Sequence, residues 1–173
     1  MKTLTDHLAQ YAAYHRDPRN LVSHFIGIPM IVLAVAILLS RPGIDAFVWL
    51  SPAALVALAA ALFYWRLDLR FAIVMGGVLL ACVWLGAWLA EQSTTIWLGS
   101  GLTLFVVGWV IQFIGHFYEG RKPAFVDDLT GLIIGPLFVA AELGFLLRWR
   151  EPLRQAIEAR VGPVRVRQHP VDA

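Results

Sequence analysis

Four long stretches of this sequence contain no formally charged side chain, and they constrain the fold more than any other feature. They cover Leu21–Ser40, Ala46–Trp65, Phe71–Ala90 and Gln92–Tyr118. A helix needs about 20 predominantly apolar residues to cross the hydrocarbon core of a bilayer, and each stretch reaches this length. The whole chain is 59% hydrophobic and 15% charged, whereas a soluble domain has roughly 25% charged residues. The sequence therefore predicts an all-α, polytopic membrane bundle with four transmembrane helices, and it argues against a soluble enzyme or a nucleic-acid-binding protein.

A fifth apolar stretch, Leu129–Leu147, is interrupted by Gly135 and Pro136. If only the four longer stretches cross the bilayer and the N-terminus is cytoplasmic, thirteen of the fourteen Lys and Arg residues are cytoplasmic and only Arg41 lies outside. If the fifth stretch also crossed, the six arginines from Arg148 onward would move outside, and the split would be seven to seven. The positive-inside rule favours the first arrangement. We therefore expect a broken re-entrant or interfacial helical segment, interrupted near the Gly-Pro pair, and two cytoplasmic termini.

The expected domain organisation is one membrane-embedded catalytic domain, residues 1–148, followed by a basic cytoplasmic tail, residues 149–173. No apolar core of a cleavable signal precedes the first span, so we expect the chain to enter the membrane through that span. We expect a helix over Thr5–Arg16 to lie along the interface before it. The tail contains a short helix around Leu153–Val161. A sequence pI near 9.0 in a membrane protein indicates contact with anionic lipids. We expect an integral protein of a bacterial inner membrane, and a homo-oligomer remains open.

Four polar residues lie at the cytoplasmic ends of the first and fourth expected spans, namely His15, His24, His116 and Glu119. His116 and Glu119 are three residues apart, which places both side chains on one side of a helix, as in the metal sites of helical bundles. A proline in the segment Arg16–Asn20 predicts a turn between the first two histidines. The topology therefore brings the four side chains to the same face of the bundle.

Imidazole nitrogens combined with one carboxylate and open positions suit non-haem Fe(II) and oxygen chemistry. Ionisable groups at membrane depth are rare and usually functional. Each histidine alone could equally be a hydrogen-bonded or snorkelling side chain. The alternative is a non-enzymatic lipid-binding or transport-like membrane protein whose histidines form a hydrogen-bond network. A di-iron lipid hydroxylase is disfavoured, because the chain has five histidines and none of the clustered histidine boxes of that class.

Three further polar residues have two interpretations each. Gln112 lies one helical turn before His116 and faces the same way, so it is either a partner of the metal site or a helix–helix hydrogen bond. Arg121 could hold the carboxylate of an acidic lipid, or it could be a cytoplasmic anchor of the span. Glu142 could pair with an arginine or orient a metal ligand.

These residues belong to two blocks of characteristic sequence. The first contains Tyr14-His15, Pro18, Asn20, His24, Gly27 and Pro29. The second contains Gly108-Trp109, Gln112-Phe113-x-Gly115-His116, Glu119, Arg121, Pro123-Ala124, Pro136 and Glu142. In combination, the two blocks resemble the small membrane 2-hydroxy fatty acid dioxygenases of fungi and bacteria, over about residues 8–148.

The resemblance implies an Fe(II)-dependent α-oxidation, in which a long-chain 2-hydroxy fatty acid and O₂ give the fatty acid one carbon shorter. It implies that His15, His24 and His116 are metal ligands. Glu119, Arg121 and Asn20 are expected to be catalytic residues, with Glu119 either a ligand or a neighbour of the ligands. The expected partners are the fatty acid, O₂ and membrane lipids, with no nucleic acid. A long-chain acid dissolves in the bilayer, so the site is expected at the cytoplasmic membrane interface.

Overall fold

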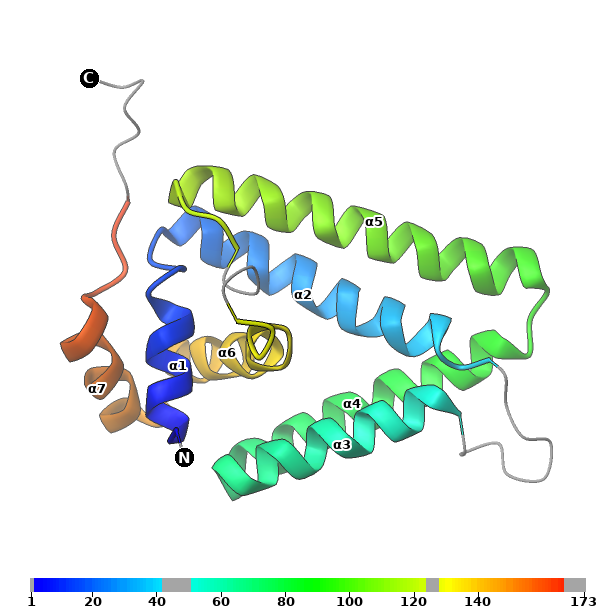
Figure 1. Ribbon diagram of the computed structural model, residues 1–173, viewed down its shortest axis with the longest axis horizontal. Coiled ribbons are helices and arrows are strands. Elements are labelled where there is room, and N and C mark those ends of the chain that lie inside the picture. The colour runs from blue at the N-terminus through cyan, green and yellow to red at the C-terminus, as the bar shows by residue number, and fades with distance from the viewer. Residues whose placement is uncertain (1, 42–50, 124–127, 167–173) are drawn as a thin grey trace. The chain divides into compact units, whose positions relative to one another are not determined.

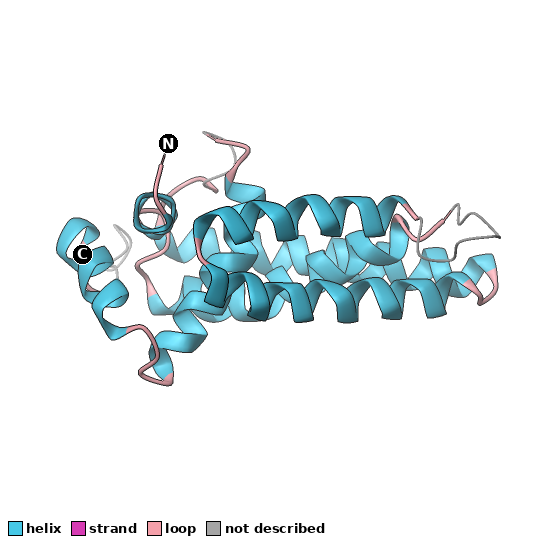
Figure 2. Cartoon of the chain, turned by 90° about the horizontal axis from the view of Figure 1, so that it is seen from below, coloured by secondary structure: helices cyan, strands magenta, loops and turns pink. Residues whose placement is uncertain are grey.

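The structure is a computed structural model that describes residues 2–41, 51–123 and 128–166. Across these ranges all regular structure is helical (Figures 1 and 2). The helices are α1 (Leu4–Ala12), α2 (Pro18–Leu38), α3 (Pro52–Leu67), α4 (Leu69–Ala90), α5 (Thr94–Glu119), α6 (Gly131–Leu146) and α7 (Glu151–Val161). The predicted all-α class is thus confirmed for the described part of the chain.

Three helices, α2, α4 and α5, are long and apolar enough to cross a membrane, and the bent pair α6 and α7 would make a fourth if the pair is one span. The second predicted span corresponds to α3, which has only 16 residues and is shorter than a full span. The beginning of that predicted span, residues 46–50, lies outside the described residues. The helices are compatible with a membrane bundle, whereas the count of four spans and the orientation of the termini remain predictions.

Helix α4 leaves much of its apolar surface uncovered. Ile73, Leu80 and Trp84 are 68%, 62% and 59% exposed. A water-soluble protein rarely exposes contiguous apolar surface of this kind, because its burial would be strongly favourable. Contact with lipid would account for this surface.

The described chain forms two compact units, residues 1–28 with 110–173, and residues 29–109. In the second unit α3 and α4 pack against each other as a hairpin, and one extended residue, Asp68, joins them. Its side chain accepts hydrogen bonds from the backbone N–H groups of Arg70 and Phe71, at 2.9 and 3.1 Å. The carboxylate therefore caps α4 at the point where the chain reverses.

In the same unit, a group of polar contacts lies at the end of α2. The indole N–H of Trp97 donates to the carbonyl of Ile37 at 2.7 Å. The guanidinium of Arg41 lies 4.6 Å from the Trp97 ring centroid and donates to the carbonyls of Ala90 and Gln92. These bonds satisfy helix-end carbonyls that would otherwise lack a partner.

In the first unit, α1 packs against both α6 and α7. A capping box between Thr3 and Asp6 begins α1, and Asp6 also pairs with Arg160 of α7 at 2.7 Å. The predicted helix over Thr5–Arg16 is therefore present but ends at Ala12, before the turn. The predicted short helix in the tail is confirmed as α7.

The predicted break of Leu129–Leu147 near Gly135-Pro136 is wrong, because α6 runs continuously through both residues. Pro136 lies in the second turn of the helix, where its missing N–H removes a single backbone hydrogen bond. The chain turns later instead. Arg148 and Arg150 adopt left-handed φ values of 57° and 62°, and α7 leaves at 114° to α6.

Candidate metal centre

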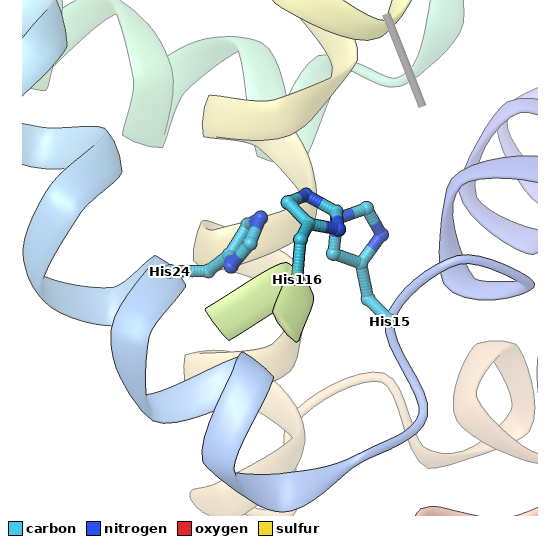
Figure 3. A group of neighbouring side chains, drawn as sticks. All are labelled: His15, His24 and His116. Atoms are coloured by element: carbon cyan, nitrogen blue, oxygen red, sulfur yellow. The ribbon is translucent and has the colours of Figure 1, made fainter. Parts of the chain in front are cut away.

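Three histidines from three different segments converge in the first unit (Figure 3). His15 follows α1, His24 lies in the second turn of α2, and His116 lies near the end of α5. One ring nitrogen from each lies within 4.8 Å of the other two. All three side chains are buried. The predicted convergence of these residues is therefore seen in the structure.

The three rings lie close together at steep angles to one another. The centroids of His15 and His24 are 4.4 Å apart, and both lie about equally far from His116, at 5.0 and 5.1 Å. The interplanar angles are 67° to 81°. The rings therefore do not stack on one another, and one nitrogen of each ring lies within 4.8 Å of the other two.

Two of the rings are oriented by the backbone in the same way. The Nδ1–H of His15 donates to the carbonyl of Tyr11 at 2.6 Å, and the Nδ1–H of His24 donates to the carbonyl of Asn20 at 2.9 Å. In each case the acceptor lies four residues earlier in the chain. A carbonyl oxygen can only accept a hydrogen bond, so each bond places the proton on Nδ1. The other ring nitrogen, Nε2, is then unprotonated and carries a lone pair. Histidine ligands of metals are usually held in this way.

The remaining nitrogens fit a metal. Within the described residues, neither His15 Nε2 nor His116 Nδ1 has a hydrogen-bond partner, although both atoms are buried. Burial lowers the pKa of His15 well below its ordinary value of 6.5, with a further contribution from the neighbouring His24 ring, so the imidazole is neutral and can bind a cation. Three neutral imidazoles suit Fe²⁺, Zn²⁺, Cu²⁺ or Ni²⁺ and leave open positions. The residues therefore fit a divalent transition metal without selecting one.

Glu119 supports the histidine-bearing turn. Its Oε2 accepts hydrogen bonds from the backbone N–H groups of Arg16 and Asp17, at 2.9 and 2.8 Å, and from the side-chain amide of Asn20 at 3.1 Å. The side chain is 1% exposed. Of the two expected roles for Glu119, ligand or neighbour of the ligands, this geometry favours the second, because the carboxylate holds the residues that follow His15.

Asn20 links two of the histidine segments. Its amide nitrogen donates to the carbonyl of Tyr14 as well as to Glu119, while its own carbonyl orients His24. It also lies against α5 at Gly115, where an added Cβ would be 2.6 Å from Asn20 Oδ1. Asn20 is thus placed to position the ligands.

Arg16 ties the same turn to the other helices of the unit. Its guanidinium forms a buried ion pair with Glu142 of α6 at 2.9 Å, which confirms the interpretation of Glu142 as the partner of an arginine. Its Nε donates to the carbonyl of Ala12 at 3.1 Å, and its own carbonyl accepts from the backbone N–H of Arg165 at 2.9 Å. The tail therefore contacts the turn that carries His15.

Two other candidate residues of the sequence analysis are Arg121 and Gln112. Arg121 is exposed and donates to the carbonyl of Ala13 at 2.9 Å, which keeps it beside the histidine-bearing turn. Gln112 is 4% exposed, in keeping with the predicted inward-facing position. Of the two histidines that do not belong to the cluster, His7 lines a separate small pocket between α1 and the start of α6, and His169 lies outside the described residues.

Sequence reasoning missed Tyr11. Its ring stacks on the His15 ring at 4.1 Å with an interplanar angle of 6°, and its carbonyl orients the same imidazole. Every helical residue is preceded four positions earlier by a backbone carbonyl, so the sequence carried no signal for this contact.

The chain is similar to known proteins along most of its length. A family model described as "2-hydroxy-palmitic acid dioxygenase Mpo1-like" matches residues 1–147, a range that includes the three histidines. A curated protein of Saccharomyces cerevisiae, named 2-hydroxy-palmitic acid dioxygenase MPO1, is 29% identical over 171 residues, which is 95% of each chain. No solved structure matches the chain.

Proposed function

Since the chain belongs to the Mpo1-like family, we propose that it is a membrane dioxygenase that shortens long-chain 2-hydroxy fatty acids by one carbon. The observation that carries the proposal is the buried cluster of His15, His24 and His116, whose ring nitrogens lie within 4.8 Å of one another. A purely structural cluster would pair these nitrogens with protein groups. Two of them have no such partner in the described residues.

The three histidines would hold Fe(II), each through one nitrogen. Bound iron would supply the electrons and the open coordination positions that reaction with O₂ requires. The carbonyls of Tyr11 and Asn20 keep two of the rings in the tautomer that ligation needs. Glu119 and Asn20 act as positioning residues, because they hold the turn after His15 and the start of α2 together.

The overall conversion balances when the 2-hydroxy acid and O₂ give the shortened acid, CO₂ and water. The substrate carries an apolar chain and an anionic head, so it is expected to lie with its chain among lipids and its head at the cytoplasmic interface. Arg121, exposed beside the histidine-bearing turn, would attract the carboxylate as it approaches. Apolar spans and a polar site in one chain suit such a substrate.

The proposal is tested by incubating the Fe(II)-loaded protein in lipid nanodiscs with 2-hydroxyhexadecanoic acid and O₂. The expected product is pentadecanoic acid, and the His116→Ala variant should produce none while remaining folded. Equal turnover by that variant would remove the histidines from the mechanism. A wild-type protein that binds the fatty acid but neither retains iron nor converts the acid would instead support the non-enzymatic lipid-binding alternative.

A further inference from the structure

Gln112 is a buried amide in an apolar helix, and the described residues offer no hydrogen-bond partner to its nitrogen. The side chain is 4% exposed, and Nε2 is fully buried and unbonded within those ranges. Burying a donor without an acceptor is unfavourable, and most buried polar atoms in proteins are paired. The amide nitrogen of Gln112 therefore needs a hydrogen-bond acceptor, which a bound ligand could supply.

Gln112 shares one face of α5 with the metal cluster. It lies four residues before His116, and side chains at this spacing are neighbours on a helix. The opposite face of the same helical segment is apolar and exposed, since Val110 and Ile114 are 51% and 52% exposed. The amide is thus directed into the protein, on the side where His116 lies.

Two protein-internal roles do not account for this amide. A hydrogen bond to the metal ligand is not made, because His116 Nδ1 is also unbonded in the described part of the chain. A bond to a neighbouring helix is likewise not found within that part. A ligand oxygen beside the metal would satisfy the donor.

We propose that Gln112 is a substrate-binding residue that hydrogen-bonds the 2-hydroxyl of the fatty acid, an inference that rests on the proposed function. A primary amide both donates and accepts, and a hydroxyl requires both, whereas a carboxylate only accepts. A buried group of this kind selects strongly, because an analogue without the hydroxyl leaves the amide unpaired. Gln112 would therefore distinguish a 2-hydroxy fatty acid from an ordinary fatty acid of the same length.

The test uses Gln112→Met, which keeps an unbranched side chain of similar size and removes the amide. Binding of 2-hydroxyhexadecanoic and hexadecanoic acids is measured with Zn²⁺-loaded protein in nanodiscs, so that no turnover occurs. The wild type should prefer the hydroxy acid by at least about tenfold, the effect of one lost hydrogen bond, and the variant should bind both acids equally. Metal content should be unchanged, and the melting temperature of the ligand-free variant should be equal or higher, since an unpaired buried donor is removed. The matched control, Gln155→Met on the exposed surface of α7, should change none of these values.

Different results separate the possible failures. A preference that survives in Gln112→Met overturns the inference and leaves the proposed function standing. A lower melting temperature with lost metal in that variant means that Gln112 is structural, and it also overturns the inference. Gln112→Asn, which retracts the amide by one methylene, should fold and lose the preference as well, so a preference retained there counts against the assignment. If the wild type shows no preference and forms no pentadecanoic acid, both the inference and the proposed function fail.

Discussion

Gly115 allows α2 and α5 to approach closely beside the histidines. A Cβ added at this position would lie 1.9 Å from Ser23 Oγ and 2.6 Å from Asn20 Oδ1. Atoms in ordinary contact are about 3.5–4.0 Å apart, so Gly115→Ala must displace Ser23 and Asn20 by roughly 1 to 2 Å. Neither atom lies at the end of a long flexible side chain, and both residues belong to the first two turns of α2.

The displacement reaches the metal cluster through Asn20. Its carbonyl orients His24, and its amide bonds Glu119, so a shift of Asn20 moves His24 relative to His116. Losing the orientation of a ligand typically lowers metal affinity by about 10- to 100-fold. Overpacking lowers the free energy of unfolding by about 1–3 kcal/mol. The higher helix propensity of alanine offsets about 0.5–1 kcal/mol of this loss. We therefore predict a net destabilisation of about 1–2 kcal/mol together with weaker metal binding.

The assay is competitive metal titration combined with thermal unfolding in nanodiscs. Gly99→Ala is the matched control, because Gly99 lies on the same helix and an added Cβ there meets nothing within 4 Å. The control should keep wild-type metal affinity and equal or slightly higher stability. Wild-type affinity and stability in Gly115→Ala would refute the close packing of α2 on α5 as the support of the site.

Three other perturbations have defined outcomes. Glu119→Gln should keep the metal stoichiometry and lower stability by about 1.5–3 kcal/mol, because hydrogen bonds to a charged acceptor are weakened; loss of stoichiometric metal would instead make Glu119 a ligand. Arg16→Met should destabilise by about 3–5 kcal/mol because it leaves Glu142 buried without its partner, and adding Glu142→Leu should recover most of the loss in a double-mutant cycle. His15 stays neutral when folded but is protonated in the unfolded chain below about pH 6.5. The unfolded state then binds more protons, so His15 makes the unfolding free energy of the metal-free protein fall with decreasing pH, by up to about 1.4 kcal/mol per pH unit. His15→Asn should remove this contribution from the slope measured in denaturation experiments at pH 5 to 8, and an unchanged slope would contradict the assigned state of His15.

The residues that bear chemistry were predictable because topology constrains them. Apolar runs of spanning length placed His24 and His116 at helix ends on one side, and the turn after His15 returned the chain to the same place. Local sequence rules suffice for this, since helical length and turn chemistry act over a few residues.

The supporting contacts were not predictable, because they depend on tertiary packing. The partners of Glu119 include the backbone amides of Arg16 and Asp17, more than one hundred residues earlier, and backbone groups carry no sequence signal. The continuity of α6 through Pro136 was missed for a related reason. A proline rule treats the residue alone, whereas the surrounding helices decide whether one lost backbone bond is tolerated.

Metal content per chain tests the central claim most directly. The wild type and the variants His15→Asn, His24→Asn and His116→Asn are loaded anaerobically with Fe(II), freed of excess metal and analysed by elemental mass spectrometry. If the three histidines form one site, the wild type should retain about one iron per chain, and each variant should lose most of it while remaining folded. A wild type without bound metal, or three variants that retain iron as the wild type does, would contradict the metal centre.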